Sequence, residues 1–332
     1  MDTVTQIVLG TAIAEGWFRR ELGRKSLLFG AFCGWFPDSD VLLHRFGTWE
    51  SMVSHRAETH SLLCLPLFAL PLAWVGHRWG KKGRWGQWYH LAFWAVVTHP
   101  LLDSFTSYGT QLFAPLSNVR IAWDGVGIID LIYTLPLIYV CWHAFRQKSD
   151  RAQSQKHARW ALGLTTLYLL FGFALSQRAI QHSTARFKAE GFEPVAVKAN
   201  PALLFSFLRR VTARDARGHL ITTSYSPFMR DAVIVRHTPP EVPELNAILE
   251  SEEGQIFSWF NEGFYSVHIE DQTLTLVDAR YGFQSDPWNS PFSATVDLNA
   301  WPEAKLQLQQ RPKLDIGAEF SLGWKRMWGL SN

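Results

Sequence analysis

The feature that most constrains this chain is a series of apolar runs confined to its first half. Trp85–Leu102, for example, contains no Lys, Arg, Asp or Glu. Each run is shorter than the ~20 residues of an ideal membrane-spanning helix. The pattern nevertheless predicts a membrane α-helical bundle of about six short helices. The runs cover residues 3–18, 26–37, 61–76, 85–102, 126–142 and 160–177.

The distribution of Trp, Lys and Arg agrees with a membrane location. Of the 16 Trp residues, eleven precede position 181, many of them near the ends of apolar runs, where interfacial aromatic residues are common. Three loops, 19–25, 78–84 and 146–159, carry most of the basic residues of this half. If these loops are cytoplasmic, six helices alternate consistently and the polar motifs share the opposite face. A soluble helical bundle with buried helices is the alternative.

The second half has a different pattern. Short runs rich in aliphatic, aromatic or Thr residues are separated by Gly, Pro or Asp, which is typical of strands and turns. Glu241–Glu252 is the predicted helix among them, and residues 177–188 are expected to prolong the last apolar helix. We therefore predict a helical domain at 1–180 and a small extramembrane mainly-β or α+β domain at 181–332. The expected strands are Leu203–Val211, His219–Ser224, Ala232–Arg236, Thr273–Val277 and Ala294–Leu298.

The charge pattern argues against a nucleic-acid partner. The formal net charge is only +3, and the basic residues lie in short loops and form no continuous stripe. Membrane lipid is the partner that the sequence favours, while the oligomeric state is left open.

Histidine and carboxylate side chains gather at the ends of the apolar runs, on the face opposite the basic loops. These residue types are the usual protein ligands of zinc, manganese and iron. They are costly in or beside a membrane, so they are candidates for function. We predict a divalent-metal site, with zinc as the expected metal and Mn or Fe as alternatives. The candidate ligands are Asp38, Asp40, His55, His60, His99 and Asp103.

Each motif has a simpler interpretation when it is taken alone. His99 and Asp103 share one face of a helix, but the carboxylate also suits a helix end. Asp38 and Asp40 fit a helix N-cap. His55 and His60 would point about 140° apart on a regular helix, so either a helix begins between them or they serve different metals. Their convergence on one face makes the joint case stronger than any single motif.

Other polar residues suggest supporting roles. Glu58 and Asp124 are the predicted bases or orienting groups, and Arg56 is the predicted contact for an anionic substrate. Arg45 and Arg120 are expected on the same face, where contact with lipid headgroups is the alternative. Asp130 lies within an apolar run and needs a partner, because an unpaired carboxylate there is expensive.

Several short motifs of the chain form a recognisable set. They are Met1–Thr5, Pro37–Asp40, His55–Ser61, His99–Gln111 and Ile129–Asp130, with Asn200–Pro201 and Asp278–Gly282 in the second half. Through these motifs the chain resembles the YdjM/YbcI-type family of membrane-bound proteins, described as metal-dependent hydrolases. The resemblance implies a bacterial inner-membrane location and a metal-dependent hydrolase. The family is distantly similar to zinc phospholipase C and P1 nuclease, which implies a phosphoester substrate.

One position departs from the family pattern. Family members usually carry His where this chain has Gln6, and an amide is a poorer zinc ligand than imidazole. We therefore expect either an outer role for Gln6 or a weakened metal site.

Two main hypotheses follow from the sequence. The first is an enzyme that hydrolyses a phosphoester or lipid-linked substrate with metal-activated water, its active face and C-terminal domain extracytoplasmic. The second is a non-catalytic membrane scaffold with a structural or degenerate metal site. A transporter or proton relay built on Asp130 and the histidines is a third, weaker hypothesis.

Overall fold

The chain folds into two compact units. The computed structural model describes residues 1–332 except 43–47, 147–150, 230–231, 284, 310–314 and 331–332. The first unit comprises Met1–His44 and Ser54–Phe173, and the second comprises Arg45–Val53 and Ala174–Asn332. The long helix α8 (Arg151–Ala189) contributes to both units, and the expected boundary at residue 180 lies within it.

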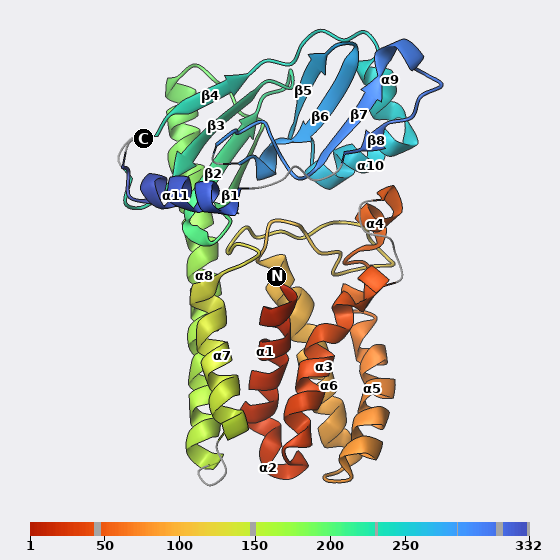
Figure 1. Ribbon diagram of the computed structural model, residues 1–332, viewed down its shortest axis with the longest axis vertical. Coiled ribbons are helices and arrows are strands. Elements are labelled where there is room, and N and C mark those ends of the chain that lie inside the picture. The colour runs from red at the N-terminus through yellow and green to blue at the C-terminus, as the bar shows by residue number, and fades with distance from the viewer. Residues whose placement is uncertain (43–47, 147–150, 230–231, 284, 310–314, 331–332) are drawn as a thin grey trace. The chain divides into compact units, whose positions relative to one another are not determined.

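The first unit is helical, as the apolar runs predict (Figure 1). The expected continuation of the last apolar run into residues 177–188 is also confirmed, since α8 reaches Ala189. The helices are α1 (Thr3–Ile13), continued by a π-helical turn (Ala14–Phe18), α2 (Arg19–Leu22), α3 (Lys25–Trp35), α5 (Leu65–Gly80), α6 (Trp85–Ser104), α7 (Leu131–Arg146) and the first part of α8.

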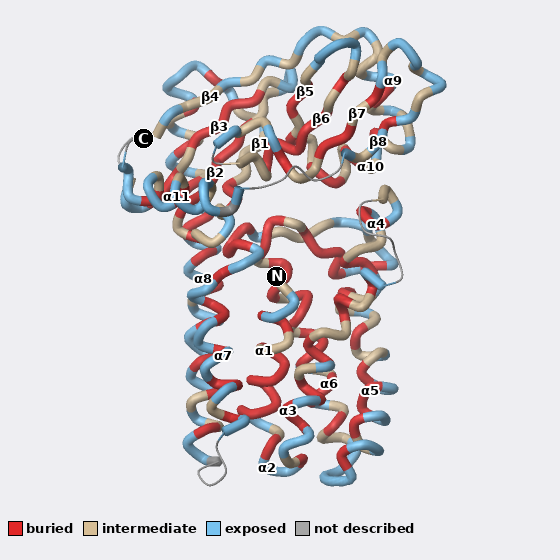
Figure 2. Tube along the Cα trace, viewed as in Figure 1, coloured by how far each residue is buried: buried red, intermediate tan, exposed pale blue. Residues whose placement is uncertain are grey.

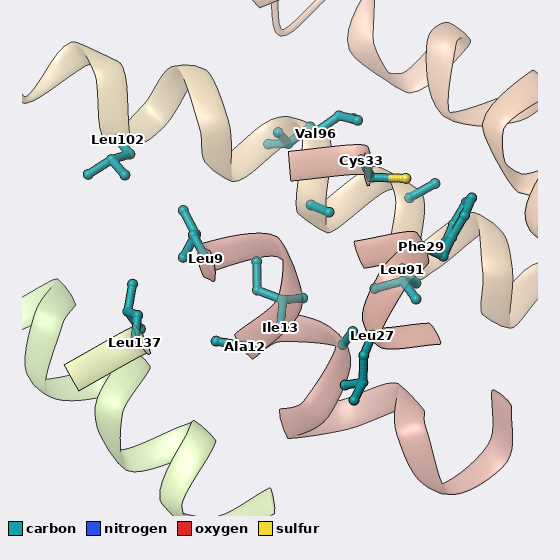
Figure 3. Close-up of a cluster of buried hydrophobic side chains, with 14 of the residues drawn as sticks. Leu9, Ala12, Ile13, Leu27, Phe29, Cys33, Leu91, Val96, Leu102 and Leu137 are labelled. Atoms are coloured by element: carbon teal, nitrogen blue, oxygen red, sulfur yellow. The ribbon is translucent and has the colours of Figure 1, made fainter. Parts of the chain in front are cut away.

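Close packing of α1 on α3 fixes the centre of this unit. A Cβ atom added to Gly10 would lie 2.1 Å from the carbonyl oxygen of Gly30, and one added to Gly34 would lie 2.4 Å from that of Gln6. Only glycine allows backbones to approach this closely. Buried side chains of α1, α3, α6 and α7, including Leu9, gather around this contact (Figure 3).

The outer helices expose apolar surface. Along α5, α7 and α8 buried and exposed residues alternate, whereas α1 is buried over most of its length (Figure 2). By length and composition, one described helix, Ala152–Ala189, is able to cross a membrane. The pair Trp49–His60 and Leu65–Gly80 passes the same test together, but with a 68° bend. The six-helix membrane bundle therefore stays a prediction.

The second unit contains two antiparallel four-stranded sheets, so the expected mainly-β or α+β character is confirmed. Each sheet keeps its strands in sequence order, as a meander. One sheet has β1 (Ala196–Ala202), β2 (Phe205–Arg214), β3 (Leu220–Tyr225) and β4 (Ile234–His237); the other has β5 (Tyr265–Glu270), β6 (Thr273–Asp278), β7 (Ser293–Asp297) and β8 (Gln307–Leu308).

Short helices complete the second unit. The predicted helix at 241–252 is split by Ser251, whose side chain accepts a hydrogen bond from Gly254 N and so begins a new helix. A further helix, α4, comes from an early stretch of sequence: Trp49 packs edge-on against Phe257 and donates its indole N–H to Leu306 O. The helices are α4 (Trp49–Ser54), α9 (Leu245–Glu250), α10 (Glu252–Asn261) and α11 (Ile316–Met327).

Candidate metal centre

Four of the six predicted ligands converge in the first unit. Ligand atoms of these four residues all lie within 4.8 Å of one another; they are Asp38, His60, His99 and Asp103. His99 and Asp103 come from adjacent turns of α6, while Asp38 and His60 come from two 3-10 helices, Phe36–Leu42 and Glu58–His60. The site thus combines one regular helix with two irregular segments.

The spacing of the donor atoms suits one metal ion. His99 Nε2 lies 3.3 Å from Asp38 Oδ1 and 3.6 Å from Asp103 Oδ2. His60 Nε2 lies 3.8 Å and 3.5 Å from the same two oxygens. Ligands about 2.0–2.1 Å from zinc stand about 3.3–3.4 Å apart at the corners of a tetrahedron. A small contraction around a cation would therefore satisfy all four contacts.

Buried atoms without hydrogen bonds also point to a cation. His60 Nε2, His99 Nε2 and Asp103 Oδ2 are fully buried and accept no hydrogen bond from the described part of the chain. Such atoms are expensive in a folded protein unless something satisfies them. Of the four ligand residues, Asp38 keeps the most exposed side chain, at 12%. The donor set therefore fits a divalent metal.

Outer contacts set the tautomers of both histidines. His99 Nδ1 lies 2.7 Å from the carbonyl oxygen of Gly34, so this nitrogen carries the proton and Nε2 presents its lone pair to the site. Thr59 donates its hydroxyl to Asp40 across 3.2 Å, and its oxygen lies 2.9 Å from His60 Nδ1. Because the hydroxyl has one hydrogen, its oxygen accepts from Nδ1–H, and Nε2 of His60 is again free to bind a metal.

Asp40 and His55 are not among the four converging residues and instead contact each other next to them. Asp40 accepts from the Arg56 backbone N–H at 3.1 Å, and both of its oxygens lie 3.1 Å from His55 Nδ1. Burial acts to raise the pKa of Asp40, but the hydrogen bond and charge of His55, the charge of His60 and the Arg56 backbone N–H together outweigh it, and the pKa is lowered. Burial lowers the pKa of His55, which favours the neutral ring. The structure therefore places this pair as supports of the loop that carries His60.

Arg56 lies directly beside the site. Its Nε is 3.0 Å from Asp103 Oδ2, and it donates to Thr106 Oγ1 across 3.2 Å. The guanidinium carbons of Arg56 and Arg120 lie 4.9 and 4.6 Å from the ring centre of Tyr108. Two cationic groups thus share one aromatic ring next to the cluster. Arg45 lies outside the described residues.

The remaining predicted residues are dispersed. Glu58 is exposed, two residues before His60 in the same 3-10 turn. Asp124 is buried, with a φ of 49° that Asp tolerates better than most residues. Asp130 is paired: it accepts from the Tyr133 backbone N–H at 3.0 Å and from the Tyr168 hydroxyl at 2.8 Å.

Sequence reasoning missed two supporting groups. Thr59 received no supporting role from its sequence context, and the carbonyl of Gly34 carries no side-chain signal. Gly34 precedes His99 by 65 positions, so the sequence gives no hint that the two residues are in contact. These contacts depend on how α1, α3 and α6 pack.

Comparison with known proteins finds a family match over the part of the chain that contains the candidate metal centre. The family model described as YdjM inner membrane protein matches residues 1–180, more than half of the 332 residues. The chain belongs to the YdjM inner membrane protein family. It is also 28% identical over 131 residues to the inner membrane protein YbcI of Escherichia coli (strain K12), across 36% of this chain and 75% of that relative.

Membership in the YdjM family confirms the resemblance that the motifs suggested, and it makes the chain an inner membrane protein. The matched region contains all four residues of the candidate metal centre. No solved structure matches the chain. The more distant similarity to zinc phospholipase C and P1 nuclease therefore stays a prediction.

Proposed function

We propose that this YdjM-family protein is a membrane-bound, metal-dependent hydrolase of a phosphoester or lipid-linked substrate. The observation that carries the proposal is the convergence of three buried atoms from His60, His99 and Asp103 that accept no hydrogen bond among the described residues. Of the three, only Asp103 Oδ2 has a cationic neighbour among the described residues, the Arg56 guanidinium. With Asp38 they would hold one divalent metal, for which zinc has suitable ligands. Such an ion, when bound, lowers the pKa of a water ligand and polarises the scissile group.

The residues around the centre have distinct proposed roles. Arg56 holds Asp103 in place and, with Arg120, presents positive charge to an anionic substrate. Guanidinium groups suit phosphate oxygens because they donate two parallel hydrogen bonds. Glu58, the exposed carboxylate beside His60, receives the proton of the attacking water, and Asp124 acts as an orienting group.

The exposed apolar surface supports a multi-pass arrangement. Leu67 and Trp74 on α5 are 65% and 58% exposed, and Leu135 on α7 and Leu164 on α8 are 55% and 60% exposed. Continuous apolar surface on several helices is unusual for a soluble protein and normal for one that faces lipid. With the basic loops cytoplasmic, the metal centre and the second unit are extracytoplasmic, where the centre meets lipid headgroups or lipid-linked phosphoesters.

A structural metal site is the second candidate. Four protein donors are enough to complete a tetrahedral zinc site, and structural sites are closed in this way. The partial exposure of Asp38 favours the catalytic version, because a ligand that moves aside or binds through one oxygen leaves a position for water.

Metal analysis of the detergent-purified protein tests whether the site exists, and a hydrolysis assay then separates a catalytic metal from a structural one. The His60→Ala/His99→Ala double variant should lose the zinc or manganese that the wild type retains, and the Thr11→Val variant should keep it. Thr11 is a matched control because it is a buried polar residue of α1 whose hydroxyl donates to the Ile7 carbonyl oxygen. Metal-dependent cleavage of a chromogenic phosphodiester or a phospholipid, lost in Arg56→Gln with metal retained, would support hydrolysis. Full metal content without such cleavage across phosphoester and lipid substrates would favour a structural site.

A further inference from the structure

The second unit carries an exposed aromatic surface that its own cores do not use. Four side chains, called here the aromatic patch, are each nearly half exposed: Phe228 at 49%, Phe320 at 46%, Trp324 at 46% and Trp328 at 44%. They form one continuous surface, since Trp328 stacks on Phe228 with ring centres 4.7 Å apart and lies 5.8 Å from Trp324. Large apolar patches of this kind mark interaction sites.

The helix α11 presents three of these side chains in a row. Phe320, Trp324 and Trp328 are four residues apart, so they lie along one face of the helix. The side of the helix next to this row is packed: Met327 is buried, and a Cβ on Gly323 would lie 3.0 Å from the Phe205 ring of β2. The helix is therefore anchored to the sheet, while the aromatic row beside that contact stays nearly half exposed.

The charges on α11 are arranged along its length. Lys325 and Arg326 lie among the aromatic residues of the last turn, while Asp315 and Glu319 lie at the beginning. Glu319 accepts hydrogen bonds from the backbone N–H and hydroxyl of Ser285, and Asp315 caps the helix. The last turn of α11 therefore carries both aromatic and positively charged residues, and this positive charge is complementary to anionic headgroups.

Contacts within the second unit show which end of the unit carries the patch. Phe192 packs against Phe187 near the end of α8, and seven residues later Ala199 O accepts from the Ser176 hydroxyl. The segment that enters β1 therefore runs antiparallel to α8. The tip of the β1–β2 hairpin, 202–205, continues in the same direction, towards the residues of α8 that precede Ser176.

The patch is attached to this hairpin tip. The Phe205 ring lies 5.0 Å from that of Phe320 and 6.1 Å from that of Trp324. Figure 1 shows α11 beside β1 and β2. At the same end of the unit, α8 passes into its apolar portion, which belongs to the described helix able to cross a membrane. The aromatic patch therefore lies at the end of the unit from which the chain enters the apolar segment.

We propose that the aromatic patch docks the second unit onto the headgroup layer of the bilayer in which the protein resides. Trp and Phe side chains beside Lys and Arg are the typical composition of interfacial membrane contacts. The occupant is a lipid surface with anionic headgroups. The proposal is independent of the metal centre, so neither depends on the other.

The test uses full-length protein labelled with 5-fluorotryptophan and placed in phosphatidylcholine nanodiscs, with and without phosphatidylglycerol. Trp324→Phe and Trp328→Phe assign the two fluorine resonances, and Trp301, packed beside the β5–β8 core, is the internal reference. We expect spin-labelled lipid to broaden both patch resonances several-fold more than that of Trp301. Lys325→Gln should reduce the additional broadening caused by phosphatidylglycerol.

Two results would overturn the proposal. In one, a water-soluble paramagnetic reagent reaches Trp324 and Trp328 in nanodiscs as readily as in detergent, and spin-labelled lipid leaves them unaffected. In the other, the two residues are shielded from water only when two copies share a disc, which would make the patch a self-association surface.

Discussion

Gln6 donates its side-chain amide to Asp103 Oδ1 across 2.9 Å, and the same nitrogen lies 3.2 Å from the carbonyl oxygen of His99. The residue where the family resemblance leads us to expect His thus bonds to one metal ligand and to the backbone of another. Gln6 is fully buried, and its Oε1 has no hydrogen-bond partner among the described residues. An amide at this position is consistent with a role in orienting the ligands.

Replacing Gln6 by Leu should therefore weaken the metal centre. Loss of the donor removes one of the contacts that hold Asp103, alongside those of Arg56 and the N-terminal amine. Removal of such outer contacts typically costs about 10–100-fold in metal affinity. Competition with a chromogenic chelator measures the zinc affinity of detergent-purified protein. Thr11→Val on the same helix is the control, and an unchanged affinity in Gln6→Leu would refute the orienting role.

Thr59→Val should produce a similar loss by a different route. The variant removes the hydroxyl between His60 Nδ1 and Asp40, so the ring of His60 loses the contact that fixes its tautomer. We expect about 10-fold weaker zinc binding. Thr59→Ser keeps the hydroxyl and should bind zinc as the wild type does. Equal affinities of the Val and Ser variants would contradict the prediction.

Tyr168→Phe should destabilise the first unit without loss of metal. The phenol donates to Asp130 Oδ2 across 2.8 Å, and a hydrogen bond to a charged group contributes about 1.5–3 kcal/mol. Thermal unfolding in detergent should show a lower midpoint, and metal analysis should show unchanged content. Lost metal at unchanged stability would instead connect Asp130 to the metal centre.

His237 should make the second unit less stable in mild acid. Burial and the neighbouring His268 lower the pKa of His237 from 6.5 to about 4, and its Nε2 accepts a hydrogen bond from Val267 N–H. Between these pH values the unfolded chain binds a proton that the folded unit does not. The free energy of unfolding therefore falls as the pH drops from 6.5 towards 4.

The unfolding midpoint of the His237→Gln variant, followed across the same pH range, is the measurement. Its decline with acid should be shallower than that of the wild type, because one proton-linked group is gone. Asp286 lies near His268 and acts to raise the pKa of that ring, so His268 is the weaker contributor. Identical pH profiles of wild type and variant would contradict the assignment.

Trp49→Ala should destabilise the second unit although position 49 precedes it in sequence by more than a hundred residues. The indole packs against Phe257 and donates to Leu306 O. Because Trp49 is half-buried, a loss of about 3 kcal/mol is expected, at the low end for Trp→Ala. Limited proteolysis should cleave the variant faster within residues 174–332, while Trp17→Ala, an exposed change in the first unit, should not.

The sequence predicted the helices well because their signal is local. Apolar runs with few or no charged residues mark α1, α3, α5, α6 and α7, and their ends differ from the prediction by only a few residues. Three strands (β1, β5 and β8) and one helix (α11) had weaker signals and were not predicted. Ala196–Ala202 contains Asn200 and Pro201, which resemble a turn, yet it is an edge strand, where Pro is tolerated. The prediction also omitted β5 and α11, whose stability comes from the unit around them.

The metal centre was partly predictable for the same reason. His99 and Asp103 are one helical turn apart, so their sequence spacing implies a shared face. Asp38 and His60 reach the centre from 3-10 segments whose path depends on tertiary packing. The supporting positions of Asp40 and His55 have no local pattern that distinguishes them from ligands. The sequence indicated which residue types would bind a metal. Only the fold showed which of them converge on the candidate site and which of them support it.

The insertion of α4 has a mechanical consequence. The chain leaves the first unit after His44, lends Arg45–Val53 to the second unit and returns at Ser54, next to His55. No single cut of the backbone therefore separates two intact units. The two residues that brace the His60 loop, Asp40 and His55, also bracket this excursion, and His55 directly follows the last residue of α4. A pull on α4 would therefore act first on His55, one of the supports of the candidate metal centre.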